Sequence, residues 1–69
     1  MARMQHFEAM LTRPESLMRV RAARPEIERI GGRMEIQPSG SRDLSLVLLR
    51  LPEPHQPDDF LPDIPFFPV

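Results

Sequence analysis

Few side chains in this 69-residue sequence could carry chemistry, and they form no recognised catalytic or metal-binding pattern. The chain has no cysteine, and its two histidines, His6 and His55, stand near opposite ends. Nucleophilic catalysis needs a serine or cysteine activated by a base, and no serine lies in a Gly-x-Ser-x-Gly elbow. His55, Asp58 and Asp59 could touch a metal, but the prolines around them fix no ligand geometry. We therefore predict a protein that is not an enzyme and holds no cofactor or metal.

Phosphate recognition has two candidate features. The pair Gly31-Gly32 lacks the other glycines and the Lys-Ser/Thr pair of a phosphate-binding loop, so we interpret it as the end of a helix. Six arginines between residues 13 and 33 could contact nucleic acid. The same window contains three glutamates and no aromatic residue, and the whole chain has net charge −1. This pattern favours a solvated charged face and a protein partner over nucleic acid.

Charge and proline divide the chain near Leu51. Residues 1–50 hold all nine arginines and six acidic residues, so their net charge is +3. Residues 51–69 hold four acidic residues and no basic one, net −4, together with six of the nine prolines. Such a proline density excludes a regular helix or a central strand. We therefore predict a small domain over residues 1–51 and an acidic tail over residues 52–69.

The small size of the chain predicts association. A domain of this length buries a modest core, and without cysteine it cannot be reinforced by disulfides. We therefore expect a homo-oligomer or a subunit of a larger complex. The sequence has no run of about 20 apolar residues, the length needed to span a membrane. Its N-terminus also lacks the apolar core of a signal peptide. We expect no membrane association and a cytoplasmic location.

The first part of the domain predicts one or two short helices. Residues 2–11 carry apolar side chains at helical spacing and predict a short helix. Thr12 and Glu15 have the spacing of a capping box, which places the start of a second helix near Arg13. The alternation of apolar and basic residues over 18–22 leaves a short strand as the alternative. Pro25 predicts either a kink or the start of a new helix.

The second part of the domain predicts a β-hairpin. Residues 33–37 alternate polar and apolar, and residues 44–51 are apolar on both faces. The intervening residues 38–43 are rich in turn formers. The predicted fold class is therefore α+β, with one or two short N-terminal helices, a β-hairpin and an extended proline-rich C-terminal arm.

Two local resemblances accompany this pattern. The segments 31–36 (Gly-Gly-Arg-Met-Glu-Ile), 39–40 (Ser-Gly) and 48–52 (Leu-Leu-Arg-Leu-Pro) resemble the C-terminal helix, strand and strand of histidine-kinase-type ATPase domains. The resemblance covers residues 22–54 and implies the helix-strand-strand order. The ATP-binding motifs of that family are absent, so it does not imply nucleotide binding. Residues 27–36 also resemble the helix-to-strand step of small phycobilisome linker domains.

The tail is the most distinctive part of the sequence. Pro54 and Pro57 lie three residues apart, and so do Pro62, Pro65 and Pro68, which is the period of a polyproline II helix. Residues 60–69 also contain three of the four phenylalanines. An apolar ribbon of this kind suits a groove on a partner, although it could instead fold back over its own sheet or remain disordered. The apolar residues predicted to anchor a partner, and the acidic residues predicted to pair with basic groups around them, are Phe60, Leu61, Ile64, Phe66 and Phe67, and Asp58, Asp59 and Asp63.

We therefore predict a small accessory or regulatory protein that binds a partner protein through its C-terminal arm. The hairpin strand is expected to offer an edge for self-association through Leu44, Leu46 and Leu48. One alternative is an antitoxin-like or DNA-linked regulator with an arginine-rich front and a tail that neutralises a partner. Another is a degenerate fragment of a histidine-kinase-type ATPase domain.

Overall fold

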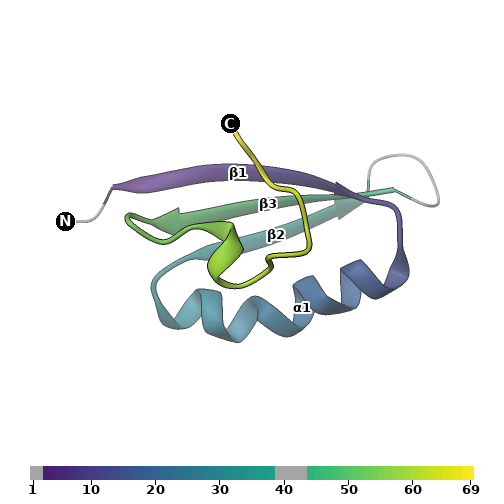
Figure 1. The fold of residues 1–69 in the computed structure, drawn as a ribbon, viewed down its shortest axis with the longest axis horizontal. Coiled ribbons are helices and arrows are strands. Elements are labelled where there is room, and N and C mark those ends of the chain that lie inside the picture. Colours follow the sequence, from purple (N-terminus) through teal and green to yellow (C-terminus); the bar gives the residue numbers. More distant parts are fainter. Residues whose placement is uncertain (1–2, 39–43) are drawn as a thin grey trace.

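The computed structural model describes residues 3–38 and 44–69, and in them one α-helix packs on one face of a four-stranded antiparallel sheet (Figure 1). This is an α+β fold, as the sequence predicts. The elements in chain order are β1 (Met4–Leu11), α1 (Pro14–Arg29), β2 (Arg33–Pro38), β3 (Ser45–Pro52), the short 3-10 helix η1 (Pro57–Asp59) and β4 (Phe67–Pro68).

The sheet order is β2-β3-β1-β4, so β3 lies between β2 and β1. Both neighbours of β3 are antiparallel to it, and the long connection from β1 to β2 is made by α1. The predicted hairpin is confirmed by the β2–β3 pair, in which Met34 lies opposite Leu49 and Ile36 opposite Val47. The turn predicted over residues 38–43 lies, except for Pro38, outside the described residues.

The prediction of a helix over residues 2–11 is wrong, because this segment forms β1. Its side chains alternate: Phe7, Ala9 and Leu11 are buried, and their neighbours in β1 face away from the core. The apolar residues that suggested helical spacing include Met4 and Met10, which are exposed. Pairing with β3 along all eight residues of the strand decides the conformation, and that partner lies about forty residues away in the sequence.

The helix predicted to begin near Arg13 is present and runs without a break, so neither the short strand at residues 18–22 nor a new helix at Pro25 forms. The helix begins at Pro14 with Arg13 as its N-cap, and no side chain caps it, so the predicted Thr12 capping box is not formed. A proline at the first helical position needs no hydrogen-bond partner for its nitrogen. Gly31 ends the helix region at φ 89°, as predicted from the glycine pair. The side chains of α1 that lie in or against the core are Leu17, Val20, Ala23 and Ile27, and the C-cap Ile30 also packs against it.

Pro25 lies inside α1 rather than at a helix boundary. Replacing it with alanine is expected to stabilise the protein by about 2 kcal/mol. Proline in a helix interior costs about 3 kcal/mol of stability, but it offsets about 1 kcal/mol of that cost by lowering the conformational entropy of the unfolded chain. Urea unfolding followed by far-UV circular dichroism measures the change. Pro14→Ala is the matched control and should give no such gain. An unchanged or lower midpoint for Pro25→Ala would contradict the prediction.

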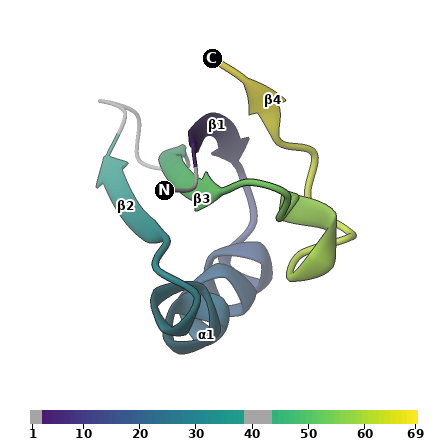
Figure 2. The same cartoon turned by 90° about the vertical axis from the view of Figure 1, so that its left-hand side faces the viewer.

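The C-terminal arm is not the continuous extended ribbon that the sequence suggested. It contains η1 and a turn after Leu61, and the amide of Leu61 donates to the carbonyl of Pro57 at 2.8 Å. Leu61 and Ile64 are buried with residues of the sheet and of α1. The segment that contains η1 lies beside α1 on the same side of the sheet (Figure 2). The arm therefore completes the core of the small domain.

Candidate functional site on the open sheet face

The structure separates the five predicted apolar anchors of the arm. Leu61 and Ile64 are buried in the chain's own core, and Phe60 and Phe66 are half-buried against it. Phe67 is 63% exposed. In this conformation only Phe67 offers most of its side chain to another molecule.

The predicted acidic residues of the arm have separate environments. The Arg19 guanidinium lies 2.6 Å from the Asp63 carboxylate and ties the arm to α1. The Asp59 carboxylate accepts a hydrogen bond from the backbone amide of Gln56 at 2.9 Å and so caps η1. Asp58 is exposed. Two of the three carboxylates therefore already have partners within the chain.

The expected self-association edge is wrong, because β3 is an inner strand. Its backbone pairs with β2 on one side and with β1 on the other, which leaves no free edge. Leu44 is half-buried just before the strand. Leu46 and Leu48 are half-buried and point to the face of the sheet opposite the core, so they belong to a surface and not to an edge.

We call this surface the open face: the side of the sheet turned away from α1, against which no described helix or strand lies (Figure 2). Residues directly opposite one another on neighbouring strands share a face, so the register arranges the open face in rows across the sheet. In order along the strands, these are the Met4 row (Met4, Pro52), the cationic row (His6, Arg50, Arg33), the acidic row (Glu8, Leu48, Glu35) and the Met10 row (Met10, Leu46, Gln37).

The cationic row places the charges of two arginines on neighbouring strands, with the His6 imidazole beside them. Arg50 lies directly opposite Arg33 on one side and His6 on the other. Opposed like charges on neighbouring strands are unfavourable. Among residues 3–38 and 44–69 the ion pairs are Arg19–Asp63 and Arg29–Glu26, neither of which involves this row. The row therefore has no ion-pair partner in the described part of the chain.

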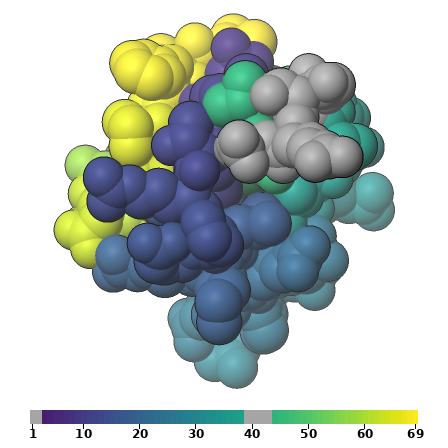
Figure 3. Space-filling view, turned by 90° about the vertical axis from the view of Figure 1, so that its right-hand side faces the viewer, coloured from purple at the N-terminus to yellow at the C-terminus, as the bar shows by residue number. Residues whose placement is uncertain are grey.

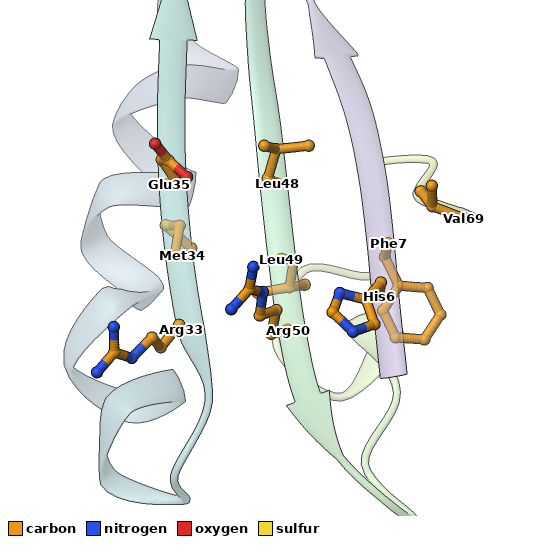
Figure 4. A pocket seen from close by; sticks show the side chains of 9 residues that line it. All are labelled: His6, Phe7, Arg33, Met34, Glu35, Leu48, Leu49, Arg50 and Val69. Atoms are coloured by element: carbon orange, nitrogen blue, oxygen red, sulfur yellow. The ribbon is translucent and has the colours of Figure 1, made fainter. Parts of the chain in front are cut away.

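The cationic row lines a shallow hollow of about 540 Å³ that also reaches the acidic row (Figure 4). In Figure 4 the His6 ring and the Arg50 side chain lie next to each other between β1 and β3, and the Arg33 guanidinium points away from β3. The Glu35 carboxylate points along β2 away from Arg33 and accepts a hydrogen bond from Gln37 at 3.1 Å. Positive and negative groups thus occupy adjacent rows without forming an ion pair among the described residues.

The end of the arm forms the border of the open face. β4 places Phe67 opposite Glu8, and the Val69 amide donates to the His6 carbonyl at 2.9 Å. Phe67 is therefore beside the acidic row and Val69 beside the cationic row, with Val69 76% exposed. Figure 3 shows the yellow C-terminal residues lying directly against the purple N-terminal strand. The arm thus adds two apolar side chains to the surface.

The side chains of the open face are apolar, basic and acidic. In the described ranges no group of three or more histidine or acidic side chains is placed to hold a metal ion. No helix in the described part of the chain is long and apolar enough to cross a membrane. What the open face offers is exposed apolar area together with charged side chains of both signs.

Sequence reasoning missed the open face because it assigned residues 2–11 to a helix. In a helix His6 would have no fixed relation to Arg50 or Arg33. The alternation of buried and exposed residues from Phe7 to Leu11 was the available signal. The cross-strand rows also depend on the β1–β3 register, for which the sequence contains no local signal.

The chain matches no protein-family model, and neither the curated proteins nor the solved structures include a significantly similar one. The resemblances to histidine-kinase-type ATPase domains and to phycobilisome linker domains stay predictions.

Proposed function

We propose that this protein is a non-enzymatic accessory or regulatory protein that binds a partner protein through the open face of its sheet. The observation that carries the proposal is the cationic row, in which His6, Arg50 and Arg33 stand side by side without an ion-pair partner among the described residues. A partner that supplies negative charge would pair with the two arginines of this row. Complementary charge of this kind gives an interface its specificity and its register.

Exposed apolar side chains on the same surface support a protein partner. Met10 is 51% exposed, and Phe67 and Val69 are more exposed still. Large apolar side chains gathered on one face and bordered by charged groups are typical of protein–protein interaction sites. Methionine and phenylalanine are also enriched in the centres of such interfaces.

The end of the arm belongs to the proposed interface. The arm's inner residues Leu61 and Ile64 hold it against the core, so they serve folding. Its last residues carry Phe67 and Val69 to the border of the open face. We therefore propose that the arm contributes to partner binding through these two side chains.

The DNA-linked alternative would depend on the arginines of α1. Two of them pair within the chain, Arg19 with Asp63 and Arg29 with Glu26. The open face also carries acidic side chains next to its cationic row, and these would repel phosphate groups. The charges of the described residues therefore favour a protein partner.

Site-specific photo-crosslinking in the producing cells tests this proposal. A photoreactive amino acid replaces Met10 on the open face or, as a matched control, Met18 on α1, which is 69% exposed. We expect a defined crosslinked protein species from position 10 and none from position 18, because only the first lies in the proposed interface. Gel mobility and mass spectrometry identify the species. Equal crosslinking from both positions, or none from position 10, would contradict the proposal.

A further inference from the structure

We propose that the partner bound by the open face is a second copy of this chain, related to the first by a two-fold axis. This inference rests on the proposed function and names its partner. The observation behind it is the order of the four rows along the strands: apolar, cationic, acidic and apolar. A face with this order is complementary to itself when one copy is turned end over end and laid on the other.

The rotation brings opposite charges together. Adjacent rows lie two residues apart along each strand, which is about 7 Å. A two-fold axis that runs across the strands, midway between the cationic and acidic rows, lays the cationic row of one copy over the acidic row of the other. Arg33 then faces Glu35 of the second copy, and His6 faces Glu8. Since the axis repeats every contact, each pairing occurs twice.

The same rotation brings apolar residues together at the ends of the strands. The Met4 row of one copy lies over the Met10 row of the other, so that Met4 faces Met10 and Pro52 faces Leu46. In the middle, Leu48 lies over the aliphatic stem of Arg50, which can pack on apolar surface while its charged end remains near water. The two-fold rotation therefore lays each of the two outer, mainly apolar rows on the other outer row of the second copy.

The border formed by the arm obeys the same symmetry. Phe67 lies beside the acidic row and Val69 beside the cationic row. Exchange of these two rows between copies places Phe67 of one copy against Val69 of the other. Two of the most exposed apolar side chains of the described chain would thus cover each other.

Charge selects this orientation over the other face-to-face dimer. A two-fold axis along the strands would lay the cationic row on the cationic row and the acidic row on the acidic row. Like charges across an interface are strongly unfavourable. The axis across the strands instead supplies Arg33 with the carboxylate that it lacks within its own copy. The rows therefore predict the orientation of the dimer as well as its existence.

Charge reversal within one column of the face provides a sharp test. Arg33→Glu leaves two acidic residues in the β2 column, and Glu35→Arg leaves two basic ones. Each variant alone should dissociate at least about tenfold more readily than the natural chain, because each places like charges together across the interface. An equimolar mixture of the two should form a heterodimer, since the acidic column of one then faces the basic column of the other. The double variant Arg33→Glu with Glu35→Arg should again self-associate.

Sedimentation velocity of the full chain over a range of concentrations measures these states, and far-UV circular dichroism verifies that each variant is folded. Arg24→Glu on α1 is the matched control and should dimerise like the natural chain. Dimers of the natural chain, weakened single variants and a restored mixture support the proposal. A natural chain that is monomeric at every concentration overturns it, and so does a mixture that associates no better than its components.

The two proposals fail in different ways. A monomeric chain that crosslinks from position 10 to a different protein overturns self-association and leaves partner binding through the open face in place. A chain that neither self-associates nor crosslinks from position 10 overturns both.

Discussion

Substitution of Ile64 by alanine is expected to destabilise the protein by about 2–5 kcal/mol, the range found when buried isoleucine is truncated in protein cores. Ile64 lies in the arm, yet its side chain is buried among residues of the sheet and of α1. The core of a domain of this size rarely supplies more than about 3–5 kcal/mol of net stability. The single substitution should therefore leave much of the chain unfolded, although it lies in the segment richest in proline.

Urea unfolding followed by far-UV circular dichroism measures this effect, since the chain has no tryptophan or tyrosine to serve as a fluorescence probe. Phe67→Ala is the control from the same arm. Phe67 is mostly exposed, so at concentrations where the chain is monomeric its loss should change stability by no more than about 0.5 kcal/mol. Equal effects of the two substitutions would show that the arm does not pack as part of the core.

The packing of the arm could be predicted from the sequence only in part. The sequence left three alternatives for the apolar residues of the arm, including Leu61 and Ile64: a groove on a partner, the chain's own sheet, or disorder. The choice between these depends on whether α1 leaves part of the sheet uncovered, which no local pattern reveals. The structure shows the second arrangement for these two residues and leaves Phe67 exposed.

The hairpin and the helix were predictable because their signals are local. Residues 33–37 alternate in polarity, and the glycine pair that precedes them marks the end of α1. The first strand was not predictable in the same way. Its apolar residues fit a helix as well as a strand, and its pairing with β3 closes a loop of about forty residues. A conformation determined by distant pairing cannot be derived from the segment itself.

The candidate site follows the same distinction. The sequence placed the predicted site in the arm, where composition is unusual. Arg33 was considered only as one of six arginines that could contact nucleic acid, and Arg50 received no role. The open face is formed by cross-strand register, which joins His6, Arg50 and Arg33 from three separate strands. Each of these residues is ordinary in its own segment. They become a candidate site only as a row, in which neither arginine has an ion-pair partner among the described residues.

Gly32→Ala is expected to destabilise the protein by about 3 kcal/mol or more, at the upper end of the cost of inserting a group into a packed site. A Cβ at this position would lie 2.7 Å from the carbonyl oxygen of Arg50 and 3.0 Å from that of Ile27, so β3 and the end of α1 would have to separate.

Gly31→Ala is the matched control. Gly31 has φ 89° but no atom within 4 Å of an added Cβ, and its cost should remain about 1–2 kcal/mol. Urea midpoints compare the two, and an equal or larger loss for Gly31→Ala would contradict the close approach at Gly32. Because Gly32 joins α1 to β2 beside Arg50, this approach also fixes where Arg33 stands in the cationic row.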